Sequence, residues 1–95
     1  MLSDLPKNTR RFAKYAYRGI NYLSRKDGKE VGFQGVYGQV RKKFQDREMR
    51  KDPPYWKDFN QAQITDLLVE ALTALEQKGL ISSDEDTGRY SIRKQ

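Results

Sequence analysis

Cationic side chains that could bind phosphate groups dominate the first half of the chain. From residue 11 to residue 25 they recur at intervals of three, four and seven positions, which places them along one side of a helix. The candidate phosphate-binding cations are Arg10, Arg11, Lys14, Arg18, Arg25, Lys26, Arg41, Lys42, Lys43, Arg47, Arg50 and Lys51. Contacts of this kind release counterions from phosphates and need no fixed base sequence.

The charge is divided unevenly between the two halves of the 95-residue chain. Residues 1–51 contain 14 lysines and arginines against 5 acidic residues, whereas residues 52–95 contain 5 against 8. The halves therefore carry +9 and −3, in agreement with the net charge of +6. This division predicts two different surfaces, of which the basic one suits a polyanion such as DNA or RNA.

Tyrosines interleave with the first group of cations, where aromatic rings could stack on unpaired bases. Tyr15 and Tyr22 flank the apolar side of the predicted helix, so we expect them to pack at its edge with their hydroxyls in water. Tyr17 lies further from the apolar and basic stripes. It is therefore the tyrosine that we expect to contact nucleic acid.

Composition limits both the size of the core and the chemistry. With 36% hydrophobic and 34% charged residues, we expect a single domain over residues 1–95 with a small core and flexible ends at 1–7 and 94–95. The chain contains neither cysteine nor histidine, so disulfides, the usual zinc sites, the common general base and the thiol nucleophile are all missing. We therefore expect a protein that is not an enzyme and uses no metal or cofactor.

The apolar segments of the sequence predict where in the cell the protein is found. The first residues lack the apolar run of a signal peptide, and no stretch approaches the ~20 apolar residues of a membrane span. We expect a soluble intracellular protein, in the cytoplasm or nucleoid, without a membrane partner.

Residues 8–25 are predicted to form the first helix. Asn8 or Thr9 can cap its start, and Gly28 suits the left-handed position that ends a helix. Its apolar stripe consists of Phe12, Ala16, Gly19, Ile20 and Leu23. This stripe should face the core, which leaves the cations on the opposite side.

Residues 36–47 are predicted to form the second helix. Its apolar positions are Phe33, Tyr37, Val40 and Phe44. Glycine recurs at every third position before and within it, at Gly32, Gly35 and Gly38. These glycines should weaken a helix before residue 38 and permit a short strand at 31–33. They do not form a phosphate loop, because no apolar strand precedes them and no Lys-Ser/Thr pair follows.

The last part of the chain predicts a helix followed by a hairpin. Asn60 can cap the helix and Gly79 ends it. Its apolar face consists of Ile64, Leu67, Leu68, Ala71, Leu72 and Leu75. Two short strands at 80–81 and 90–92 should pair through a polar turn, in which Gly88 supplies a positive φ.

The run ALTALEQKGLI, a polar turn and GRYSIR together resemble the third helix and wing of winged helix-turn-helix domains. The matching residues within 60–93 are Ala71, Leu75, Gly79, Leu80, Ile81 and Tyr90. This resemblance implies a winged-helix-like three-helix domain, mainly α with a small β-hairpin (α+β). It also implies DNA binding and transcription regulation, in which the third helix enters the major groove and the wing touches the backbone.

The residues of this chain depart from that mode of binding. The expected exposed face of the third helix carries Asp66, Glu70, Thr73 and Gln77. The wing turn carries three further acids, Asp84, Glu85 and Asp86. Because phosphates would repel these carboxylates, we expect nucleic acid to contact the basic N-terminal surface instead.

A protein-interaction or assembly subunit is the alternative function. Pro53 and Pro54 interrupt the chain before an aromatic cluster that either plugs one end of the core or anchors a partner. The candidate partner-binding residues are Tyr55, Trp56, Asp84, Glu85 and Asp86. Self-association is a version of this alternative, since the acidic half of one copy could meet the basic half of another.

Overall fold

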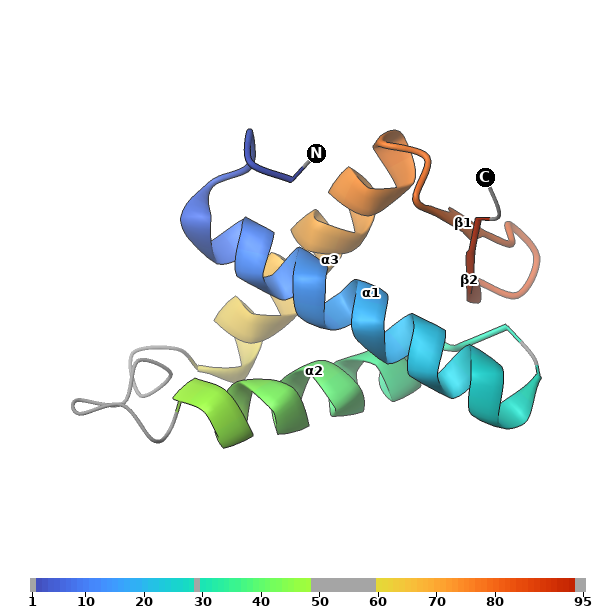
Figure 1. Ribbon diagram of the computed structural model, residues 1–95, viewed down its shortest axis with the longest axis horizontal. Coiled ribbons are helices and arrows are strands. Elements are labelled where there is room, and N and C mark those ends of the chain that lie inside the picture. Colours follow the sequence, from blue (N-terminus) through green and yellow to red (C-terminus); the bar gives the residue numbers. More distant parts are fainter. Residues whose placement is uncertain (1, 29, 49–59, 94–95) are drawn as a thin grey trace.

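The computed structural model describes residues 2–28, 30–48 and 60–93. Its first helix, α1, spans Lys7–Asp27, so the helix predicted over 8–25 is confirmed (Figure 1). Gly28 ends α1 with a φ of 64°, in the left-handed region that glycine adopts without steric cost.

The predicted cap of α1 is wrong. Asn8 and Thr9 lie inside the helix, and Thr9 is buried. Pro6 occupies the cap position without a side-chain hydrogen bond, and its carbonyl accepts a hydrogen bond from the backbone N–H of Arg10 at 2.8 Å. Proline is tolerated here because the first N–H groups of a helix have no partner within the helix.

The second helix, α2, spans Phe33–Glu48 and begins three residues earlier than predicted. Gly35 therefore lies inside it, against the expectation that the glycines would weaken a helix before residue 38. A Cβ atom placed on Gly35 would lie 3.3 Å from Cδ1 of Leu23 on α1. Close packing of the two helices at this point outweighs the low helix propensity of glycine.

Two valines of α2, Val36 and Val40, are fully buried. Phe33 and Tyr37 are half-buried, and their rings stack with centroids 6.4 Å apart and an interplanar angle of 29°. The side chain of Phe44 lies outside the described part of the structure. The predicted stripe is thus confirmed at Val40 but omitted Val36, which lies at its centre.

The third helix, α3, spans Gln61–Gln77 and begins with the predicted cap. Oδ1 of Asn60 accepts a hydrogen bond from the backbone N–H of Gln63 at 2.8 Å, and Oε1 of Gln63 accepts one from the N–H of Asn60 at 2.9 Å. This reciprocal capping box fixes the start of the helix. The predicted apolar face is confirmed, with five buried members: Ile64, Leu68, Ala71, Leu72 and Leu75.

Replacing Asn60 by alanine removes the hydrogen bond that its Oδ1 accepts from the backbone N–H of Gln63, whereas the backbone N–H of residue 60 can still donate to Oε1 of Gln63. We expect the free energy of unfolding to fall by about 1 kcal/mol, which lowers the Tm by roughly 4–8 °C in a domain of this size. Thermal unfolding followed by circular dichroism measures the change. Gln61→Ala, at the exposed next position, is the matched control, and equal Tm values for both variants would contradict a stabilising cap.

The hairpin pairs β1 (Ile81–Ser83) with β2 (Tyr90–Ile92) in antiparallel register. The predicted hairpin is confirmed, with its first strand at 81–83 instead of 80–81. Hydroxyl oxygens of Ser82 and Ser91 lie 2.9 Å apart across the strands. Val31 adds a single bridge to Tyr90, with backbone hydrogen bonds of 2.8 and 2.7 Å. The strand predicted at 31–33 is therefore reduced to one residue, because Phe33 already belongs to α2.

The wing turn depends on its first acidic residue. Oδ1 of Asp84 accepts hydrogen bonds from the backbone N–H groups of Asp86, at 2.8 Å, and Thr87, at 3.2 Å. Gly88 then takes a φ of 68°. An aspartate that bonds the backbone two residues ahead is common turn chemistry, so Asp84 has a structural role whether or not the wing binds a partner.

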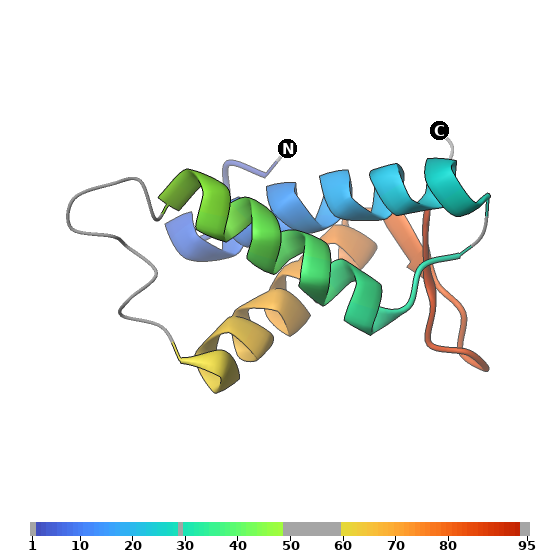
Figure 2. The ribbon, with the colours of Figure 1, turned by 90° about the horizontal axis from the view of Figure 1, so that it is seen from below.

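Helix α1 lies at the centre and packs against α2, α3 and β2. In Figure 1, α3 passes behind α1, and Figure 2 shows α3 below the pair that α1 and α2 form. The largest fully buried side chains belong to all three helices and β1: Phe12, Ile20, Val36, Val40, Leu68, Leu75 and Ile81. The predicted fold class is confirmed: the protein is mainly α with a small β-hairpin, arranged as a winged-helix-like three-helix domain.

Candidate nucleic-acid interface

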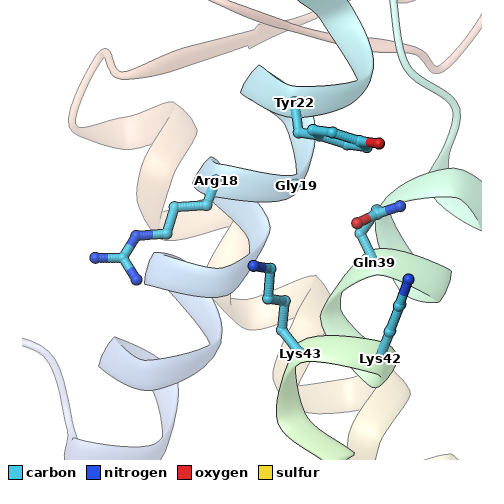
Figure 3. Close-up of a pocket in the computed structure, with 6 residues that line it drawn as sticks. All are labelled: Arg18, Gly19, Tyr22, Gln39, Lys42 and Lys43. Carbon is cyan, nitrogen blue, oxygen red and sulfur yellow. The ribbon is translucent and has the colours of Figure 1, made fainter. Parts of the chain in front are cut away.

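Helices α1 and α2 approach closely at Gly19. A Cβ atom placed on this residue would lie 3.0 Å from Cβ of Gln39, so a side chain here would force the helices apart. The contact leaves a groove of about 320 Å³ between the two helices (Figure 3). Its lining residues are Arg18, Gly19, Tyr22, Gln39, Lys42 and Lys43.

Side chains from both helices meet over this groove. In Figure 3, Tyr22 extends its ring from α1 towards Gln39 on α2, and Lys43 extends back towards α1. The side chain of Arg18 extends from α1 on the side away from Lys42 and Lys43. Arg18, Lys42 and Lys43 are exposed, and none of them forms an ion pair with another described residue. Their positive charges therefore remain available to an external anion.

A second hollow, of about 460 Å³, continues along α1 towards its C-terminal end. It shares Arg18 and Tyr22 with the first, so the two hollows form one surface. We call this surface the basic groove; it comprises Arg18, Gly19, Asn21, Tyr22, Arg25, Lys26, Gln39, Lys42 and Lys43. Five of these nine residues are lysine or arginine, and none of the described residues that line the groove is acidic.

The structure brings only part of the predicted basic set together. Lys14 is exposed on α1 outside the groove, and Arg10 and Arg11 are half-buried. Arg41 is exposed but lies about 200° around α2 from Gln39, so it points away from the groove. Three predicted members fall outside the described residues or side chains: Arg47, Arg50 and Lys51. Tyr55 and Trp56, the predicted partner anchors, also lie outside them.

The tyrosines of α1 are placed differently from the prediction. Tyr15 is buried, and Tyr17 is half-buried against the core, where it lines a mainly apolar hollow with Arg18, Leu75 and Leu80. Tyr22 is 53% exposed. Tyr17 is thus less exposed than Tyr22, because it packs against the core, and its contact with nucleic acid stays a prediction.

The acidic surfaces lie elsewhere. Asp66, Glu70, Thr73 and Gln77 are exposed on α3, as predicted, and α3 lies on the far side of α1 from the viewer in Figure 1. The wing turn lies beside the C-terminal end of α1 at the right of Figure 1. Within the described residues, no group of three acidic side chains is placed to hold a metal ion. The exposed acids of α3 do not line the basic groove, whereas Asp84 of the wing turn lines a hollow with Gly28 and Glu30 at the C-terminal end of α1.

One cation of the acidic half is already neutralised. Nζ of Lys78 donates hydrogen bonds to the carboxylate of Asp4 at 2.8 and 2.9 Å, and this contact holds the pKa of Asp4 below its ordinary value. The ion pair joins the N-terminal segment to the end of α3. Because the pKa of Asp4 is lowered by folding, the stabilisation is present above its unfolded pKa and is lost as the pH falls through its folded pKa.

Sequence reasoning missed Gly19 as a helix contact and Gln39 and Tyr22 as groove residues. Gly19 does carry a signal, because a glycine within an apolar helical stripe often marks close packing. For Gln39 the sequence carries no signal, since its position depends on how α1 and α2 cross.

Fold and groove together define a winged-helix-like domain with a basic surface on its first two helices. Comparisons with models of protein families, with curated proteins and with solved structures found no match. No described helix combines the length and apolar character that crossing a membrane requires.

Proposed function

We propose that the protein is a non-enzymatic nucleic-acid-binding module that contacts phosphates through the basic groove. One observation carries this proposal: α1 and α2 bring Arg18, Lys42 and Lys43 to one surface without a neutralising acid among the described residues. A polyanion offers phosphates at regular intervals to such a row of cations, and counterion release then drives binding.

The acidic residues of α3 also favour the basic groove as the binding surface. The exposed carboxylates of Asp66 and Glu70 on α3 would repel phosphates in the usual major-groove mode of a winged helix. A polyanion on the basic groove avoids them, because no residue of α3 lines this groove and α3 lies below α1 and α2 in Figure 2.

Two charge-matched double variants test the proposal. Lys42→Ala with Lys43→Ala removes two charges from the groove, whereas Arg89→Ala with Arg93→Ala removes two from the exposed wing. We expect the groove variant to weaken nucleic-acid binding on the order of tenfold at about 0.1 M salt, and to reduce the slope of log K against log[salt] by about 1.4–1.8. Fluorescence anisotropy at several salt concentrations measures both quantities.

The wing variant should leave binding almost unchanged, within roughly twofold on the phosphate-contact argument. Equal losses for the two variants would indicate that only net charge matters, and a larger loss for the wing variant would indicate the usual winged-helix mode. Binding that does not respond to salt would contradict a phosphate interface altogether. Circular dichroism checks that both variants remain folded.

A further inference from the structure

We infer that the basic groove takes unpaired nucleotides, with Tyr22 as the platform on which a base stacks. The inference rests on the proposed function and narrows it from nucleic acid in general to single-stranded segments. It begins with the position of Tyr22, whose ring lies between the two hollows of the groove.

Tyr22 and Val69 are the large hydrophobic residues that the described part of the structure leaves exposed. Tyr22 is 53% exposed, whereas Phe12 on the same helix is buried at 1% exposure. Its hydroxyl has no hydrogen-bond partner among the described residues. Its ring is thus open to an external planar group.

Cations flank this ring on both sides along the groove. Lys42 and Lys43 line the hollow towards α2, and Arg25 and Lys26 line the hollow along α1. A strand with one base on Tyr22 would direct its neighbouring phosphates to these two groups. Aromatic rings among cations are the common design of single-strand binding surfaces, because every base has a π-face.

Gln39 adds a group that can contact a base edge without fixing its identity. Its side chain lies opposite Tyr22 in the groove (Figure 3), and an amide both donates and accepts hydrogen bonds. The hollow beside Tyr22 has a volume of about 320 Å³, which lies at the lower end of the range for small-molecule sites and so suits a single base. In a duplex the faces of internal bases are already stacked on one another, so the ring of Tyr22 could not stack on them.

The test compares an oligothymidine of about 15 nucleotides, within the range of single-strand site sizes, with a duplex of the same length. Wild-type protein, Tyr22→Phe and Tyr22→Ala are titrated against each by fluorescence anisotropy. We expect tighter binding to the single strand. Tyr22→Ala should weaken that binding about 5- to 100-fold, whereas Tyr22→Phe, which keeps the ring, should stay within about twofold.

An abasic oligonucleotide of the same length provides the internal control. It keeps the phosphates but offers no base, so Tyr22→Ala should bind it as wild type does. If Tyr22→Ala lost as much affinity for the abasic strand as for oligothymidine, the stacking role would be overturned. The same holds if Tyr22→Ala and wild type bound oligothymidine equally well.

The outcomes separate this inference from the proposed function. Tighter duplex binding that depends on Lys42 and Lys43 but not on Tyr22 would overturn single-strand recognition and leave the phosphate interface intact. Failure of the wild-type protein to bind either oligonucleotide would overturn both. Circular dichroism of Tyr22→Ala should match wild type, since the exposed ring contributes little to the core.

Discussion

Phe12→Ala is expected to lower the free energy of unfolding by about 3–5 kcal/mol, because it leaves a large cavity in a small core. Phe12 is 1% exposed on the inner side of α1, the helix that packs against α2, α3 and β2. A domain of this size has a total stability of only about 5–14 kcal/mol. The substitution therefore removes a large fraction of that stability, and urea unfolding followed by circular dichroism measures it.

Val69→Ala is the control for this prediction. Val69 is an apolar residue of α3 that is 49% exposed, so its truncation should change stability by no more than about 0.5 kcal/mol. If Phe12→Ala unfolded at the same urea concentration as Val69→Ala, Phe12 would not lie in the core.

Gly19→Leu is expected to damage both the fold and the groove. Even a Cβ atom at this position would lie 3.0 Å from Cβ of Gln39, and the remaining leucine atoms need further space. We expect α1 and α2 to separate at a cost of about 1–3 kcal/mol. Oligonucleotide binding should also fall under conditions in which the variant is still folded, because Tyr22 and Lys43 then lie further apart.

Gly38→Ala is the matched substitution in α2. A Cβ atom on Gly38 meets nothing within 4 Å, so alanine should stabilise the helix by about 0.8–1 kcal/mol and leave binding unchanged. Chemical unfolding and anisotropy titration of the two glycine variants measure stability and binding separately. Similar results for both would contradict a close helix contact at Gly19.

The segments best predicted from sequence are those whose structure depends on local chemistry. Asn60 and Gln63 form a capping box, and Gly28 and Gly88 have the positive φ angles expected of them. Each of these features follows from the residue itself and its near neighbours. The turn hydrogen bonds of Asp84 are equally local, although the sequence prediction treated this residue only as an acidic charge and a candidate partner contact.

The features that sequence reasoning missed depend on tertiary contacts. Helix α2 continues through Gly35 because Leu23 of α1 packs against it, which no local propensity reveals. Tyr17 and Tyr22 differ in exposure because α3 covers one side of α1 and leaves another open. Helical periodicity defines the sides of a helix but does not say which of them its neighbours will cover.

The uneven charge of the two halves of the chain located the basic surface but did not define which cations belong to it. It predicted a basic surface on the first two helices, and the groove contains Arg18, Arg25, Lys26, Lys42 and Lys43. It could not exclude Arg41, which belongs to α2 but lies outside the groove. Counting charged residues shows which segment of the chain is basic, whereas the packing of the helices decides which of those residues share one surface.

The most direct test is to map the contact surface by NMR, following the backbone amide signals of ¹⁵N-labelled protein during titration with oligothymidine. The groove account predicts that the largest shifts occur at Gly19, Tyr22, Gln39 and Lys43, while the exposed face of α3 and the wing turn stay unchanged. Shifts concentrated at Asp66, Glu70 and Thr73 on α3, with none in the groove, would contradict it.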